Sequence, residues 1–139
     1  MNIICIDSDS AALRQLTRQT RSLMPNAVVH GCEEPDEVTC LAANEGCDVL
    51  LVNTDLGTKH TDGFMLAEKM QKIIPCVNII FITGRAEEKY AVEAYRLHAS
   101  GYLKKPFQTE QLQKEFANLR YPVTIHETMH YRKRSLRMI

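Results

Sequence analysis

Short apolar runs alternate along the chain with longer stretches in which apolar residues recur every three or four positions. The five runs, which are rich in β-branched residues, cover residues 3–6, 27–29, 49–52, 77–82 and 102–103. Most of them are too continuous for a half-exposed strand and are typical of strands buried on both faces of a parallel sheet. The pattern therefore predicts five buried parallel strands.

The stretches between the runs have the spacing of amphipathic helices. Their predicted inward-facing residues are Leu13, Leu16, Thr20 and Leu23; Val38, Leu41 and Ala42; Phe64, Ala67, Met70 and Ile74; Ala91, Ala94, Tyr95 and His98; and Leu112, Phe116 and Leu119. Pro and Gly residues, which end helices, mark the returns to the strands. Five strand–helix units predict an α/β fold, a doubly wound five-stranded parallel sheet with helices on both faces. Such sheets bind ligands beyond the carboxyl ends of their strands, so the chemistry is expected just after each run.

Composition fits one ordinary globular domain of 139 residues, 45% hydrophobic and 24% charged. The N-terminus lacks a basic, apolar leader pattern, and no run approaches the ~18 residues of a membrane span, so we expect a cytoplasmic protein without a membrane partner. The five cysteines are odd in number and form no C-x-x-C pair. They predict reduced thiols rather than a disulfide framework or a zinc site.

Charge divides the chain into two parts. From Arg120 onward there are five Lys or Arg against one Glu, so the tail carries about plus four and the rest about minus four. We predict a domain over residues 1–120 and, over 121–139, a basic tail or the start of a linker. The segment "YRKRSLR" is a short charge run of the kind that is usually solvated, and no base-reading module is present, so no nucleic-acid partner is expected for this domain.

The tail also contains "HETMH", residues 126–130, which matches the H-E-x-x-H pattern of zinc proteases. Such a site needs a third ligand, but no His, Asp, Glu or Cys follows His130. We interpret this match as accidental.

Polar residues follow four of the five runs. The strand ends supply Asp7, Ser8 and Asp9; Asn53 and Asp55; Thr83; and Lys105. Carboxylates that converge with a hydroxyl and a lysine on one edge would suit a divalent cation such as Mg²⁺ and a phosphoryl group. Strand ends collect polar residues in any fold, so this interpretation depends on the whole set rather than on any one member.

Three motifs place these residues in a known pattern: "IICIDSDSAALRQL", "IIFITG" and "ASGYLKKPF", the last carrying Lys105 and Pro106. With them, residues 1 to about 120 resemble a response-regulator receiver domain of two-component phosphorelay signalling. "LHASGYLKKPF" and "NLRYPV" further resemble LytTR-like regulators of Firmicutes. The resemblance implies strand order 2-1-3-4-5 in a flavodoxin-like fold.

The resemblance also implies roles. Lys105 would contact a phosphoryl group, Thr83 would hold the hydroxyl position, and Tyr102 would hold the position of an aromatic switch, with Thr83. The partner would be a histidine kinase or another signalling protein, and the domain would not be an enzyme. A homodimer is expected through the fourth helix, fifth strand and fifth helix, a face that includes Ala91, Tyr95, Tyr102 and Gln111.

The sequence departs from the family in its acidic pocket. Where receivers have two adjacent acids after the first strand, this chain has Asp7 and Ser8. Asp9 is a candidate substitute, although one residue further along a strand end the side chain points elsewhere. With Asp7 and Asp9 as its metal residues, the pocket is expected to bind Mg²⁺ weakly if at all, and no other cofactor is expected.

The segment "VNTDL", residues 52–56, leaves the phosphoryl-acceptor position open between Asn53 and Asp55. Counting forward from Asp48 gives Asn53, and counting back from Gly63 gives Asp55. We favour Asn53 because the apolar run ends there, because "NTDL" resembles the family pattern, and because "GTKHTDG" reads as a loop insertion. Asn53 predicts a degenerate receiver that acts by binding, since an amide cannot form an acyl phosphate. Asp55 predicts a phosphoryl-accepting receiver that uses Asp7, Asp9, Thr83 and Lys105.

Overall fold

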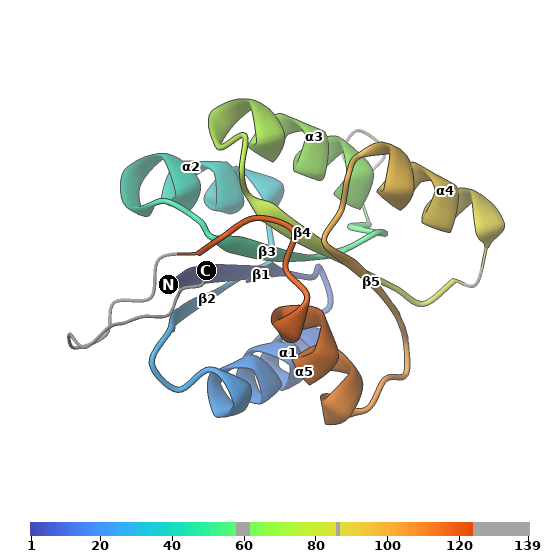
Figure 1. The fold of residues 1–139 in the computed structure, drawn as a ribbon, viewed down its shortest axis with the longest axis horizontal. Coiled ribbons are helices and arrows are strands. Elements are labelled where there is room, and N and C mark those ends of the chain that lie inside the picture. The colour runs from blue at the N-terminus through green and yellow to red at the C-terminus, as the bar shows by residue number, and fades with distance from the viewer. Residues whose placement is uncertain (58–61, 86, 124–139) are drawn as a thin grey trace.

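A computed structural model of the chain describes residues 1–57, 62–85 and 87–123 (Figure 1). Strands and helices alternate strictly in this part of the chain. Their bounds are β1 (Asn2–Ile6), α1 (Ser10–Leu23), β2 (Val28–Cys32), α2 (Pro35–Glu45), β3 (Val49–Asn53), α3 (Gly63–Ile73), β4 (Asn78–Thr83), α4 (Glu88–Arg96), β5 (Gly101–Lys104) and α5 (Thr109–Ala117). This order confirms the predicted strand–helix units.

The five strands form one parallel sheet in the order β2-β1-β3-β4-β5, as predicted. The central strands match the apolar runs, whereas the two edge strands are longer than predicted. β2 continues through His30 and Gly31 to Cys32, because its pairing with β1 is made by backbone groups and extends to Ile6. An edge strand pairs on one side only, so it accepts residues that interrupt an apolar run.

Helices cover both faces of the sheet (Figure 1). One apolar cluster joins Ile4, Leu50 and Phe81 to residues of α2, α3 and α4. A second cluster, on the other face, joins Ile3 and Leu51 to α1 and α5. Alternate residues of a strand point to opposite faces, so β1, β3 and β4 contribute to both clusters and all their apolar residues are buried.

The predicted inward face of helix α4 is wrong. Ala91, Ala94, Tyr95 and His98 were expected to face inward, but of these only Ala94 is buried, and Tyr95 is 85% exposed. The inward stripe is instead Tyr90, Ala94 and Leu97, with the spacing i, i+4, i+7. Both stripes contain Ala94 and have helical spacing, so spacing alone did not decide between them.

The cysteines are all free in the structure. Cys5, Cys32 and Cys47 are buried in the core, while Cys40 and Cys76 are exposed. Burial raises the pKa of the Cys5 and Cys47 thiols to about 12, which keeps them protonated and unreactive at neutral pH. No helix in the described ranges combines the length and apolar character needed to cross a membrane.

Candidate functional site

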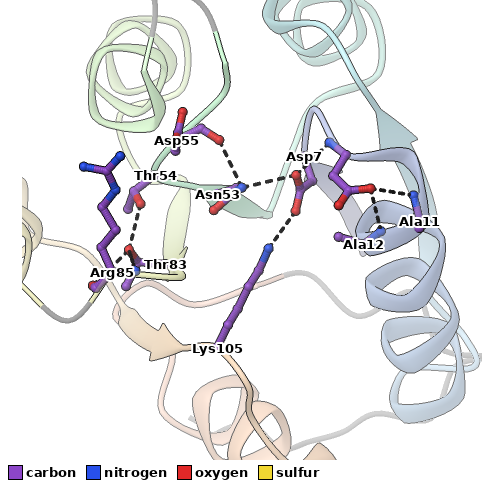
Figure 2. A network of polar contacts seen from close by, with 10 residues as sticks. Asp7, Ala11, Ala12, Asn53, Thr54, Asp55, Thr83, Arg85 and Lys105 are labelled. Atoms are coloured by element: carbon purple, nitrogen blue, oxygen red, sulfur yellow. Dashed lines mark hydrogen bonds and ion pairs between the residues drawn. The ribbon is translucent and has the colours of Figure 1, made fainter.

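The carboxyl edge of the sheet brings together three of the candidate residues. Asp7 directly follows β1, Asn53 is the last residue of β3, and Lys105 directly follows β5. Since all five strands are parallel, these positions meet at one edge although they lie up to 98 residues apart in the sequence. Figure 2 shows the side chains of Asn53 and Lys105 converging on Asp7.

Asp7 is the centre of this group. Its side chain is only 4% exposed, and the Lys105 ammonium lies 3.0 Å from its Oδ2. The other carboxylate oxygen, Oδ1, accepts hydrogen bonds from the Asn53 amide at 3.2 Å and from the Asp9 backbone N–H at 2.9 Å. A nearly buried carboxylate needs such donors, and Asp7 has three of them on its two oxygens.

The Asn53 amide bridges two oxygens that belong to different segments. Its Nδ2 donates to Asp7 Oδ1 and, at 3.0 Å, to the backbone carbonyl of Asp55 (Figure 2). An –NH₂ group has two donor hydrogens, so one amide serves both acceptors. Asn53 thereby ties the end of β3 to the end of β1 and to its own following loop.

The carboxylates of Asp9 and Asp55 accept hydrogen bonds from nearby backbone N–H groups. Asp9 is the N-cap of α1, and its carboxylate accepts from the N–H groups of Ala11 and Ala12. The exposed Asp55 carboxylate accepts from the N–H of Gly57 at 3.0 Å, where a backbone φ of 73° favours glycine. The Asp9 carboxylate is thus turned towards the start of α1, and its role as a substitute metal residue stays a prediction.

Gly63 holds the start of α3 against the end of β3. Its N–H donates to the Thr54 carbonyl at 3.0 Å, and a Cβ at this position would collide with the backbone of Asn53 and Thr54. The glycine used for the backward count therefore packs against the backbone of Asn53 and Thr54. Residues 58–61 of the proposed loop insertion lie outside the described residues.

Thr83 ends β4 at the same edge, but its hydroxyl does not reach the other candidates. The residue is fully buried; its Oγ1 accepts from Thr54 Oγ1 at 2.9 Å and from the Arg85 N–H at 3.0 Å. It also lies 3.2 Å from the Arg85 carbonyl, to which it can donate. These contacts turn Thr83 towards β3 and its own loop (Figure 2).

An open hollow of about 390 Å³ lies over the site. Its lining residues are Asp7, Ser8, Asp9, Asn53, Thr54, Asp55, Gly57, Gly84, Arg85 and Lys105. Thr83 is absent from this lining, whereas Thr54 and Arg85 belong to it without having been singled out in the sequence. Thr54 directly follows Asn53 and Arg85 lies two residues after Thr83, so the missed signal was their closeness in sequence to the candidate residues at the strand ends.

Comparison with known proteins identifies the family. The sequence model of the response regulator receiver domain matches residues 3–117. This chain belongs to the response regulator receiver domain family. A receiver of this family acts in two-component signalling.

Curated relatives of this receiver include two sensory transduction proteins named LytR. The one from Streptococcus mutans is 24% identical, over 100% of this chain and 57% of its own length. The one from Staphylococcus epidermidis is 30% identical, over 81% of this chain and 43% of its own length. The receiver thus spans about half the length of these relatives.

Solved structures share the receiver fold. A receiver domain from Clostridium thermocellum superposes with a TM-score of 0.74 at 21% identity, covering 84% of this chain and 91% of that one. A Burkholderia pseudomallei response regulator, solved with a phosphorylated aspartic acid, calcium ion and citrate, gives a TM-score of 0.72 at 27% identity. That match covers 86% of this chain and 66% of the other.

Tyr102 of this receiver lies on β5, half-buried against the cluster shared with α4. Burial, together with nearby Tyr90 and Glu87, raises the pKa of its phenol, so the side chain stays neutral in the physiological range. Its assignment as a moving switch stays a prediction. The tail motifs "HETMH" and "YRKRSLR" lie outside the described residues.

The ion pair at Asp7 yields the first prediction. We expect Lys105→Met to lower the free energy of unfolding by about 1–3 kcal/mol, because a nearly buried carboxylate loses the ammonium group paired with it. Chemical denaturation at neutral pH measures the change.

Lys104→Met is the matched control, since Lys104 is exposed on the neighbouring position of β5 and is expected to change stability little. Equal stability of Lys105→Met and Lys104→Met would contradict the assigned role of the ion pair.

Proposed function

We propose that this chain is a degenerate receiver, in which Asn53 holds the acceptor position and signalling proceeds through protein binding rather than phosphoryl transfer. One observation carries the proposal: Asn53, not Asp55, is the β3 residue whose side chain contacts Asp7. Asp7 in turn is the residue paired with Lys105. The side chain that β3 presents to Asp7 is therefore an amide.

The chemistry of an amide opposes phosphoryl transfer. A carboxylate attacks phosphorus with a charged oxygen and forms an acyl phosphate, whereas the lone pair of an amide nitrogen is delocalised into the carbonyl group. In this structure the Asn53 nitrogen also directs its hydrogens at two acceptors, Asp7 Oδ1 and the Asp55 carbonyl. It is placed as a donor, not as a nucleophile.

The residues around Asp7 fit a magnesium site poorly. A strong site needs several free oxygen ligands in an octahedral arrangement. Here both Asp7 oxygens already accept hydrogen bonds, the Asp9 carboxylate caps α1, and Ser8 stands where receivers have their second acid. Within the described residues, no three His, Cys, Asp or Glu side chains gather in a metal-binding group. Any Mg²⁺ binding is therefore expected to be weak.

The alternative is a phosphoryl-accepting receiver that uses Asp55. Its supporting observation is that Asp55 lines the same hollow as Asp7 and Lys105 and is exposed. To act, its carboxylate would have to leave the Gly57 N–H and turn towards Lys105. One experiment separates the two candidates.

The second prediction concerns phosphoryl transfer. Wild type, Asn53→Asp and Asp55→Asn are incubated with Mg²⁺ and a small phosphoryl donor such as acetyl phosphate, and intact mass is measured. We expect no stable adduct on wild type or on Asp55→Asn. Asn53→Asp is expected to gain at most partial labelling, because Ser8 leaves the metal site without its second acid.

Asp62→Asn serves as the control for loss of an acid from the same loop, because Asp62 caps α3 and does not line the hollow. Labelling of wild type that persists in Asp62→Asn and disappears in Asp55→Asn would overturn the proposal and establish Asp55 as the nucleophile.

Binding by a degenerate receiver requires an exposed surface. Helix α4 turns Val92, 60% exposed, and Tyr95, 85% exposed, towards solvent, next to exposed Ala91. Gln111 of α5 is also exposed. Large apolar and aromatic side chains of this kind are favoured at interfaces. We propose that this α4–β5–α5 face binds a histidine kinase, another signalling protein or a second copy of the chain.

The third prediction concerns that face. If it forms a symmetric dimer, Tyr95→Asp should abolish the rise of the sedimentation coefficient with protein concentration, because it places a charge in the centre of the contact. Met65→Asp on α3 is the control, since it changes a similarly apolar residue, 52% exposed, on another helix. A strictly monomeric wild type, or equal loss of association in both variants, would contradict the dimer.

A further inference from the structure

Asn78 occupies an unusual position at the amino edge of the sheet, opposite the candidate site. It is the first residue of β4 and is completely buried. The next four residues of the strand, 79–82, are also buried, but they are apolar. A carboxamide without solvent contact must find its partners within the protein. Those partners reveal what the residue does.

The Asn78 side chain makes four hydrogen bonds. Its Nδ2 donates to the Asp48 carbonyl at 3.2 Å and to the Tyr121 carbonyl at 3.0 Å. Its Oδ1 accepts from the Ser100 hydroxyl at 2.8 Å and from the Tyr121 N–H at 2.7 Å. Asp48 precedes β3, Ser100 precedes β5, and Tyr121 follows α5. One side chain therefore joins three strand starts to the segment that leaves the last helix.

The two bonds to Tyr121 run in opposite directions. Asn78 donates to the carbonyl of that residue and accepts from its N–H, as a paired peptide group does between neighbouring strands. A single bond leaves a residue free to rotate, whereas two opposed bonds fix both its position and the direction of its backbone. The carboxamide thus acts as a strand partner for one residue.

Neighbouring contacts hold the chain on either side of Tyr121. The Arg120 N–H donates to the Ser100 hydroxyl at 3.1 Å. Leu119 and Val123 pack against the apolar cluster between the sheet and helices α1 and α5. The segment 119–123 is consequently held both by hydrogen bonds from side chains to its backbone and by apolar contacts. In Figure 1 it is the red end of the described chain, which runs from α5 back across the sheet layer.

We propose that the amino edge of the sheet, centred on Asn78, is a binding site for the chain that continues beyond α5, and that it holds this continuation in one fixed orientation. The occupant is this chain's own segment 119–123. Its fixed orientation would set the direction of any part of the protein attached after it. The receiver spans about half the length of its curated relatives, so a following part of such a protein would begin from a fixed point instead of a free tether.

The location of Asn78 and its hydrogen bonds to segment 119–123, together called the anchor, supports the proposal. Asn78 lies at the amino ends of the strands, and the candidate site lies at their carboxyl ends. The α4 surface is also separate, because none of the four Asn78 bonds involves that helix. A partner on α4 and an oriented continuation would therefore not compete for the same residues.

The fourth prediction tests the anchor in the full 139-residue chain. Amide hydrogen exchange and residual dipolar couplings are measured by NMR for wild type and Asn78→Ala. In wild type we expect the Tyr121 amide to be protected, and the couplings of Tyr121 and Val123 to fit the same alignment tensor as β1 and β3. In Asn78→Ala, exchange at Tyr121 should accelerate by about tenfold or more, and its coupling should no longer fit that tensor.

Asn2→Ala is the matched control. Asn2 also begins a strand at this edge, but its side chain bonds to the Glu45 carbonyl and not to the segment after α5. It should leave Tyr121 exchange and couplings unchanged. Should Asn78→Ala fail to fold, Ser100→Ala is the milder variant, expected to release the Arg120 amide while the strands stay protected.

Two results would overturn the proposal. One is a wild-type Tyr121 amide that exchanges at the rate of an unstructured peptide. The other is a Tyr121 coupling that fits the sheet's tensor equally well in wild type and in the folded variant, which would mean that Asn78 only fills the core.

Discussion

The buried carboxylate of Asp7 sets the condition that the rest of the site meets. A charge removed from water must be matched by donors, and Asp7 receives them from three separate places: the Asn53 amide, the Asp9 backbone and the Lys105 ammonium. These contacts join the ends of β1, β3 and β5. In this receiver the buried charge of Asp7 is therefore matched by donors of the chain itself.

Such pairing within the protein would allow a receiver fold to persist without phosphoryl transfer, as we propose for this chain. The fold depends on the buried apolar strands and on Gly63, which packs α3 against the end of β3. Neither requirement involves a carboxylate at residue 53. The Thr83 hydroxyl likewise accepts from the Thr54 hydroxyl and from the Arg85 N–H, so the start of the β4–α4 connection is tied to the end of β3 by groups of the protein. The binding surface that we propose on α4 would therefore not depend on a carboxylate at residue 53.

Much of the architecture could be predicted because buried strands carry a continuous apolar signal. The runs at Ile3, Leu50 and Ile80 mark strands that are covered on both faces, and parallel order follows from the intervening helices. Edge strand β2 and the inward face of α4 were predicted less well. His30 and Gly31 pair through their backbone, and Tyr95 belongs to an apolar stripe that faces solvent. Pattern alone does not distinguish a stripe that faces the core from one that faces a partner.

The site shows a similar division. The sequence identified Asp7, Asn53 and Lys105 because strand ends in a parallel sheet share an edge, but spacing could not decide between Asn53 and Asp55, two residues apart. Their orientations depend on Gly57 and Gly63, which act through backbone geometry. Nor did the sequence indicate Asn78, since a lone asparagine beside an apolar run carries no signal of its three distant partner residues.

The central claim is that the Asn53 amide takes up the acceptors that a cation would need. The most direct measurement follows the Asn53 side-chain ¹H–¹⁵N signals of wild type by NMR during a titration with Mg²⁺ at millimolar concentrations. We predict that the two Asn53 side-chain hydrogens exchange slowly with solvent and that their chemical shifts do not change in a saturable manner as Mg²⁺ is added. A saturable shift of these signals, with faster exchange of the Asn53 side-chain hydrogens with solvent, would show that Mg²⁺ binds Asp7 and displaces Asn53. That result would contradict the proposed role of Asn53.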